Sequence, residues 1–208
     1  MNCAAAGTGA TGEAALACYR ELLRRYHRTL DLMSDRGLAQ LETKLEDAWA
    51  YAGAVARFGG RGGLLDVGTG AGLPGVVLAV ALRERAVTWV ERRRRRATFL
   101  GLVRAHCGLA NVDVVAADVR SLQAQRLPEP LAVVTAQAVG DWAALYGSTR
   151  HLHGESVVFV ARRGERWADE VSALGASISA EPAVLAAEPL GRGGTLVVLS
   201  VPGGCRCR

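Results

Sequence analysis

The chain has 208 residues, half of them hydrophobic, and a formal net charge of +5, so it can form one domain with one substantial core. No apolar run is long enough for a membrane span and the start lacks the pattern of a secretory signal, so a soluble cytoplasmic protein is expected. The five cysteines lack the paired spacing of a zinc site, so no metal is expected. The basic charge permits a polyanionic partner without proving one, because nearly all basic residues are arginines, a bias that a GC-rich genome produces by itself.

The first sixty residues predict a helical cap. Residues 1–12 are rich in small residues and are expected to be disordered. Apolar residues then recur at helical spacing from Leu16 to Leu30, with arginines on the opposite side. A second helix is predicted from Leu38 to Arg57, and the glycines of "FGGRGG" end it. We expect residues 13–60 to cover the rest of a single domain, 13–202, rather than to fold separately.

Short apolar runs alternate with helical segments in residues 61–202, a pattern typical of a parallel sheet flanked by helices. Seven strands are predicted, at Gly63–Val67, Ala86–Val90, Val112–Ala116, Leu131–Ala136, Ser156–Ala161, Ala183–Ala187 and Thr195–Val201. Helices are predicted at Pro74–Arg83, Arg93–Cys107, Asp141–His151 and Arg166–Leu174. A glycine-rich turn joins the last two strands as a hairpin, and residues 203–208 are expected to be a disordered tail. The expected fold class is α/β with a seven-stranded, mostly parallel sheet.

The segment "LLDVGTGAGLPG" joins the first strand to the next helix through Gly68, Gly70 and Gly72. Glycines are needed where a backbone turns sharply and where a ligand approaches it closely. A tight turn without a ligand would also give this pattern, but Glu91 follows Gly72 by nineteen residues at the end of the next strand. An acid at that distance is placed to accept hydrogen bonds from ribose hydroxyls, so a nucleoside ligand is expected.

Two ligands of this kind fit the loop, a dinucleotide and S-adenosylmethionine (SAM). Asp66 opens the loop, and a carboxylate that faces it would repel a pyrophosphate but suit the ammonium group of a methionine. The pattern D-x-G-x-G-x-G is similar to the first motif of class I SAM-dependent methyltransferases, so SAM is favoured. Asp118, after the third strand, is either a contact to the adenine edge or a helix N-cap.

The methyl acceptor is constrained by motifs that the sequence lacks. There is no (D/N)PP(Y/F) motif for exocyclic amines and no Pro-Cys dipeptide for attack on a pyrimidine carbon, and Cys107 is expected in a packed helix. An acceptor with its own lone pair, such as a guanine N7, needs neither a covalent nucleophile nor a strong base. Positioning and desolvation would suffice for such a transfer.

The stretch "DVGTGAGLPGVVLAVALRERAVTWVERRRRRATFL" resembles the bacterial 16S rRNA guanine-N7 methyltransferases, the glucose-inhibited division protein B family, whose loop is typically DVG[ST]GxGLPG. The GLPG part is more specific than the general methyltransferase loop. Similarity runs from "YRELLRRYHRTLDLMS" through "FVARRG" to "LVVLSV" and is strongest between Leu64 and Val115. The resemblance implies a Rossmann-like fold, SAM as cofactor, and 16S rRNA or a small-subunit precursor as partner. We expect a monomer.

Position by position, the resemblance implies SAM contacts at Gly68 and Leu73, a ribose contact at Glu91, adenine contacts at Val119 and Arg120, and a further contact at Gln137. The family's Lys-Gly after the fifth strand corresponds to Arg163-Gly164, which keeps the charge. Arg163 and Gln137 are therefore the candidate catalytic residues.

The sequence departs from the family mostly where RNA and guanine are expected to bind. Gln137 replaces an arginine and Arg120 replaces an acid. The family's Asn-Leu-Thr is "DLM", Asp31 to Met33, and its Arg-His-x-x-Asp survives only as Asp47. These changes leave two alternatives: a divergent methyltransferase for another RNA or a small molecule, and a SAM-binding protein that transfers nothing.

Five consecutive arginines, Arg92 to Arg96, follow Glu91. Residues in a helix are spaced by about 100°, so the run surrounds the helix and cannot face one ligand. Arg95 and Arg96 match basic positions of the family, and the others are either an RNA surface or a solvated face. Further arginines of the first helix and after the fifth strand are expected to join them in a basic rim. Trp142 is a weaker candidate for stacking on a base.

Overall fold

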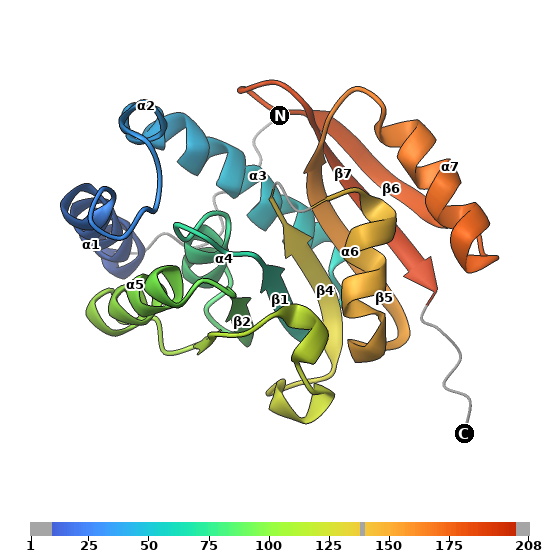
Figure 1. The fold of residues 1–208 in the computed structure, drawn as a ribbon, viewed down its shortest axis with the longest axis horizontal. Coiled ribbons are helices and arrows are strands. Elements are labelled where there is room, and N and C mark those ends of the chain that lie inside the picture. The colour runs from blue at the N-terminus through green and yellow to red at the C-terminus, as the bar shows by residue number, and fades with distance from the viewer. Residues whose placement is uncertain (1–9, 138–139, 203–208) are drawn as a thin grey trace.

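The computed structural model describes residues 10–137 and 140–202 (Figure 1). The expectations for residues 1–9 and 203–208 lie outside the described residues. Helix α1 begins at Ala10, so residues 10–12 are helical rather than disordered. In the described part of the chain, no helix has the length and apolar character of a membrane span, and no group of three or more His, Cys, Asp or Glu side chains is arranged to hold a metal ion.

A seven-stranded sheet runs through the molecule in the order β3-β2-β1-β4-β5-β7-β6. Its strands are β1 Gly63–Val67, β2 Val87–Val90, β3 Val112–Val115, β4 Leu131–Ala136, β5 His153–Arg163, β6 Ala183–Pro189 and β7 Thr195–Pro202. Strands β1 to β5 pair in parallel, whereas β7 is antiparallel to both β5 and β6. The predicted parallel sheet with a closing hairpin is confirmed.

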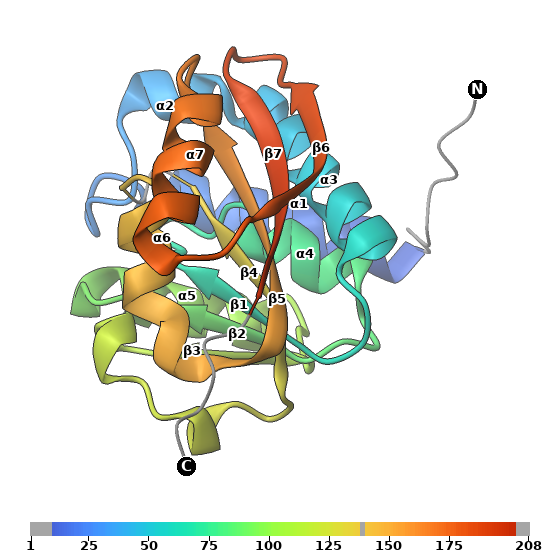
Figure 2. The same ribbon diagram turned by 90° about the vertical axis from the view of Figure 1, so that its right-hand side faces the viewer.

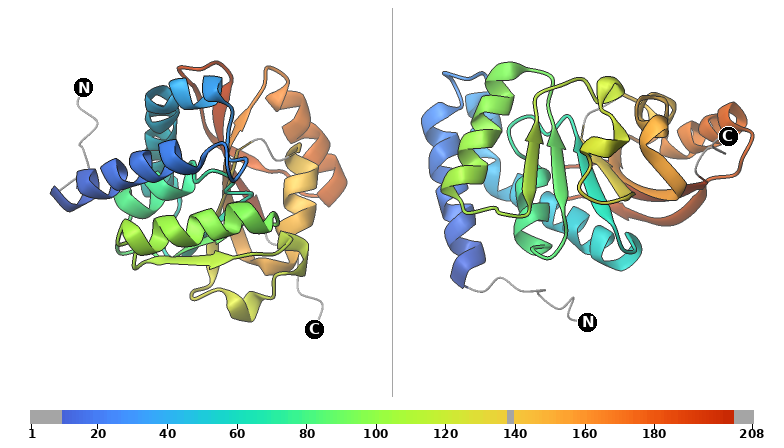
Figure 3. Two further views of the ribbon diagram at one scale, coloured as in Figure 1. Left: turned by 60° about the vertical axis from the view of Figure 1, so that its left-hand side comes forward. Right: turned by 90° about the horizontal axis from the view of Figure 1, so that it is seen from below.

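Helices cover both faces of the sheet (Figure 2). The helices are α1 Ala10–Tyr26, α2 Asp35–Ala39, α3 Leu41–Phe58, α4 Gly75–Ala81, α5 Arg94–His106, α6 Trp142–Thr149 and α7 Trp167–Ile178. One hydrophobic core joins α1, α3, α4 and α5 to one face, and a second joins α6 and α7 to the other. Figure 3 shows α1 beside α5, so the cap extends over the helices that follow β1 and β2.

The cap differs from the prediction at two breaks. The first helix ends at Tyr26 rather than near Leu30, and the chain reverses at Asp31, whose φ of 51° lies in the left-handed region that asparagine and aspartate tolerate. The predicted second helix is divided into α2 and α3 at Gln40. The Ser34 side chain accepts a hydrogen bond from the Gly37 amide and caps α2. Helical structure therefore begins at Asp35, before the start at Leu38 that the apolar spacing predicts.

Strand β5 is longer than expected, since it continues through Arg162 and Arg163. Both residues pair with β7, opposite Leu196 and Thr195. The carboxyl ends of parallel strands lie at one edge of a sheet, where ligands of open α/β sheets bind. The extension of β5 therefore places Arg163 at the same edge as the glycine loop after β1.

Candidate functional site

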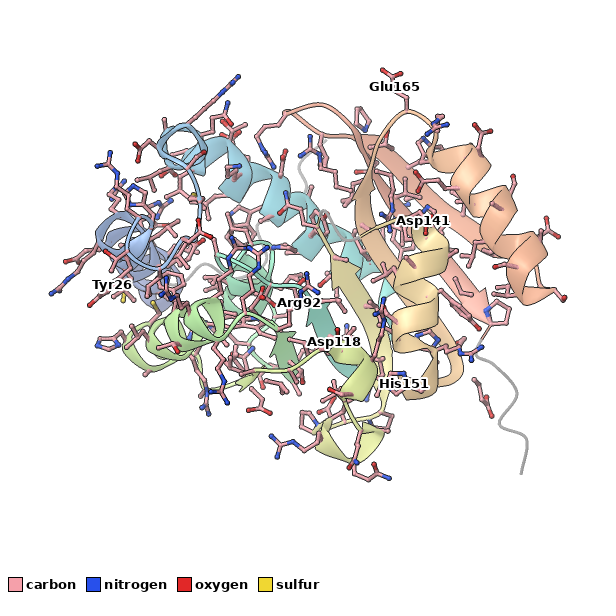
Figure 4. All side chains as sticks on the ribbon, viewed as in Figure 1. Tyr26, Arg92, Asp118, Asp141, His151 and Glu165 are labelled. Carbon is pink, nitrogen blue, oxygen red and sulfur yellow. The ribbon has the colours of Figure 1, made fainter. Side chains whose placement is uncertain are left out.

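Two cavities adjoin at the carboxyl edge of the sheet. The first has a volume of about 520 Å³ and the second about 640 Å³, both in the range of small-molecule sites. Gly68, Arg96 and Gln137 line both of them. Arg92 and Asp118 line the first cavity and lie close together in the middle of Figure 4. Two ligands, one in each cavity, would therefore come into contact near the glycine loop and the end of β4.

The glycine loop has the backbone geometry that its sequence predicts. Gly68, Gly70 and Gly72 have φ values of 68°, 60° and 110°, which favour glycine. Gly68 and Gly70 line the cavities, as does Leu73, whereas Gly72 is buried against the ring of Tyr19. Two of the three glycines thus open the backbone to a ligand, and the third allows the loop to pack on the cap.

Glu91 lies in the first cavity and is only 5% exposed. Its Oε2 accepts a hydrogen bond from the Gly70 amide at 3.0 Å, and its Oε1 accepts one from the Arg93 amide at 2.8 Å. Each carboxylate oxygen has a second lone pair for a ribose hydroxyl. The acid therefore fixes the glycine loop and keeps acceptor capacity toward the cavity.

Asp118, Val119 and Arg120 form the opposite wall of the first cavity. Asp118 is also an N-cap: its Oδ1 accepts a hydrogen bond from the Arg120 amide at 2.9 Å at the start of a short 3-10 helix, Val119–Ser121. The two readings of Asp118 are thus compatible. Val119 is buried and presents an apolar surface, and Arg120 is exposed.

Asp66 differs from the expectation that it faces the loop. It is fully buried behind the loop and lines neither cavity. Its Oδ1 accepts a hydrogen bond from the Thr135 hydroxyl at 2.7 Å, and its Oδ2 has no partner among the described residues. This position does not support a direct contact with a methionine ammonium, and Asp66 instead joins β1 to β4.

Burial raises the pKa of Asp66 to about 7, from an ordinary value of 3.8. Between these values the unfolded chain releases the proton while the folded chain keeps it, so Asp66 lowers stability progressively as the pH rises from about 4 to about 7. Asp66→Asn removes this effect and keeps an acceptor for Thr135. We expect the unfolding free energy of this variant to rise relative to that of the parent through this pH interval, by at most about 4 kcal/mol, and its melting temperature to rise relative to that of the parent with it. A difference in melting temperature between the variant and the parent that stays constant from pH 4 to 8 would contradict this.

Arg163 lies in the wall of the second cavity and is 7% exposed. Its Nη1 donates to the Gly140 carbonyl, and its guanidinium carbon lies 4.1 Å from the centre of the Trp142 ring. Its Nε is 4.0 Å from Glu170 Oε2, and Nη2 has no partner among the described residues. Trp142 is 1% exposed, and its ring packs against the Arg163 guanidinium. Its ring is therefore not available to stack on a base, contrary to the sequence-based suggestion.

Gln137 follows β4 and lies between the cavities. With its amide oriented to satisfy both ends, the nitrogen donates to the Leu73 carbonyl at 3.2 Å and the oxygen accepts from Arg192 Nη2 at 3.1 Å. Arg192 itself donates to Asp47 at 2.7 Å. A guanidinium from the β6–β7 hairpin thus lies beside Gln137, the position where the resemblance implies an arginine.

Two buried tyrosines of the cap fix the backbone around the site. The Tyr19 hydroxyl donates to the Ala71 carbonyl of the glycine loop at 3.0 Å. The Tyr51 hydroxyl donates to the Ala136 carbonyl at 3.1 Å and accepts from the Arg162 amide at 2.7 Å, so it joins the ends of β4 and β5. The cap therefore supports the loop and both strands that carry the candidate catalytic residues.

Sequence reasoning missed part of the site. Lys44 and Arg192 were not singled out, although both line the second cavity. In the arginine run, Arg92, Arg93 and Arg96 line a cavity. Arg96 donates to the Asp31 backbone carbonyl at 2.8 and 3.1 Å, a contact that does not depend on the changed side chain at position 31. No local pattern signals Arg192, because its place depends on the hairpin.

Comparison with known proteins agrees with this geometry. Residues 13–191 match the family model described as rRNA small subunit methyltransferase G. The chain belongs to this family. The resemblance inferred from the loop and the GLPG motif is thereby confirmed.

Individual relatives carry the same description. The chain is 33% identical over 156 residues to a Ribosomal RNA small subunit methyltransferase G of Halorhodospira halophila, covering 75% of this chain and 71% of that protein. It is 34% identical over 187 residues to the protein of that name from Kineococcus radiotolerans, covering 88% and 72%.

Solved structures with the same fold include a SAM-dependent methyltransferase from Aquifex aeolicus, with a TM-score of 0.59 and 16% identity over 84% of this chain and 97% of that one. MtNAS in complex with S-adenosylmethionine also matches, with a TM-score of 0.55 and 16% identity over 91% of this chain and 76% of that one. This member of the rRNA small subunit methyltransferase G family therefore has the α/β fold of SAM-dependent methyltransferases.

Proposed function

We propose that this protein transfers a methyl group from SAM to N7 of a guanine in 16S rRNA. The observation that carries the proposal is the meeting of two cavities at Gly68, Arg96 and Gln137. One cavity has the acid and the open loop that suit a nucleoside, and the other has a buried cation. Methyl transfer needs two ligands brought into contact in this way.

The residues of the first cavity fit SAM. Glu91 would accept hydrogen bonds from the ribose, Val119 would contact the adenine, and Gly68 would admit the cofactor close to the backbone. SAM supplies a methyl group on a positively charged sulfur. The contributions of the chain are to hold the donor at the glycine loop and to exclude water from the transfer.

The second cavity suits an acceptor that needs no base. No aspartate or glutamate lies among its described lining residues, and a guanine N7 already has a free lone pair. N7 and O6 are neighbouring acceptors on one edge of guanine. Arg163 lines this cavity, so its positive charge would attract O6 and leave N7 open to methylation.

The departures from the family leave these contacts in place. Arg96 reaches Asp31 through a backbone carbonyl, and Arg192 supplies a guanidinium beside Gln137. These observations favour transfer over SAM binding alone. We further infer that the protein acts as a monomer in the cytoplasm on small ribosomal subunits or their precursors.

The test is labelled-methyl transfer from SAM to purified small subunits that lack N7 methylation, followed by mapping of the modified nucleotide. A single labelled guanine N7 in 16S rRNA is the expected result. Labelling of another atom would replace the proposal with a divergent methyltransferase. SAM binding by calorimetry without any transfer to subunits would indicate a non-catalytic protein.

A further inference from the structure

The second cavity concentrates positive charge. Its described lining contains five cationic side chains and no acidic one; the cations are Lys44, Arg96, Arg162, Arg163 and Arg192. Lys44 is the only lysine of the chain. Positive charge gathered in a concave surface raises the local concentration of anions. The cavity is therefore suited to an anionic group in addition to a neutral base.

Two of these cations are held by the β6–β7 hairpin and its contacts. Arg162 donates from Nε to the Gly193 carbonyl and from Nη2 to the Arg192 carbonyl, both at 3.0 Å. Arg192 donates from Nε to Asp47, which is 5% exposed. These bonds fix both guanidinium groups in position while leaving further donors on each.

Lys44 completes the group from the cap. It lies in α3, three residues before Asp47, and its side chain is half-buried. Its ammonium donates no hydrogen bond within residues 10–137 and 140–202. Burial lowers the pKa of Lys44, and the charges of Arg192 and Arg162 lower it further, so the three cations are close enough to repel one another. Asp47 balances only one of these three charges.

We propose that Lys44, Arg162 and Arg192 form a subsite that binds a backbone phosphate of the RNA substrate beside the target base. This inference rests on the proposed function. Any RNA base that enters the second cavity brings its own phosphates with it, and phosphate and sugar groups accept about half or more of the hydrogen bonds that proteins make to DNA. The subsite adjoins Gln137, so the phosphate would hold the nucleotide in register with the methyl donor.

The test compares Lys44→Gln with Arg61→Gln, which removes one charge from an exposed residue at the opposite, amino-terminal edge of β1. Affinity for deproteinised 16S rRNA is measured against salt concentration, and transfer to small subunits lacking N7 methylation gives KM and kcat. We expect K44Q to raise KM about fivefold and to reduce the salt slope by about 0.7, the contribution of one phosphate. We expect kcat, the melting temperature and SAM affinity to change little, and K44R to restore most of the RNA affinity.

Equal effects of K44Q and R61Q, or a loss of kcat with KM and salt slope unchanged, would overturn the subsite. Inorganic phosphate is titrated by calorimetry as a separate arm. If it binds the parent but not K44Q, while affinity for RNA is the same in both, the site holds a free anion and the inference is wrong. If the parent transfers no methyl group, the proposed function fails, but the RNA-binding arm still decides the phosphate site.

Discussion

Replacement of Arg163 with methionine is expected to lower kcat by about 100-fold to 1,000-fold, the effect of removing one well-placed donor from an active site. The physical reason is the burial of this guanidinium beside Trp142 and Gly140 in the wall of the second cavity. Methionine fills a similar volume but donates nothing. Single-turnover transfer to small subunits measures the loss.

Two matched variants separate this role from a structural one. Arg163→Lys keeps the charge that the family carries at this position and is expected to retain most of the activity. Arg61→Gln removes an exposed arginine before the amino-terminal end of β1 and is expected to be neutral. SAM affinity should be unchanged in all three, because Arg163 does not line the first cavity. A loss of SAM binding in Arg163→Met equal to its loss of kcat would refute the assignment.

Gly75→Ala is expected to have the largest effect on stability among the glycines of the loop and its helix. A Cβ at this position would lie 2.7 Å from Trp89 Nε1, 2.8 Å from Asp66 Oδ2 and 2.9 Å from Thr69 Cγ2. All three side chains are 2% exposed or less, so they cannot move aside. Overpacking of this kind destabilises by about 1–3 kcal/mol, which corresponds to a melting temperature lower by about 2–12 °C.

SAM affinity should fall with the Gly75 substitution as well, since Thr69 directly follows Gly68, which lines the first cavity. Gly101→Ala is the matched control. Gly101 lies inside α5, and a Cβ there would have no neighbour within 4 Å. Alanine at a helical position without a clash stabilises by about 0.5–1 kcal/mol. Thermal melting and calorimetric titration of SAM check both variants, and a Gly75→Ala protein as stable as the parent would contradict the steric argument.

The order of elements was predictable from the sequence because each signal is local. The alternation of apolar runs and helical segments marked all seven strands, and the glycine-rich turn before Thr195 marked the hairpin. The loop from Gly68 to Gly72 and the acid at Glu91 were found by their spacing. These patterns are dictated by backbone conformation and by the faces that strands and helices bury.

Other assignments required the tertiary structure. Asp66 was expected to contact SAM, but its hydrogen bond with Thr135 and its complete burial hold it behind the loop. Trp142 was only a weaker candidate for stacking on a base, and it is buried with Arg163 over its ring. In both cases the local sequence gives the residue and its strand or helix end, and contacts across the sheet decide which way the side chain points.

The sequence alone therefore determined the α/β class, the position of the glycine loop and of Glu91, and the family. All three depend on patterns within short stretches of neighbouring residues. Only the tertiary structure decided which cations meet at the second cavity. Lys44, Arg163 and Arg192 come from α3, β5 and the β6–β7 hairpin, up to 148 positions apart (192 − 44). Their proximity depends on the antiparallel return of β7 along β5, a long-range pairing that no local periodicity encodes.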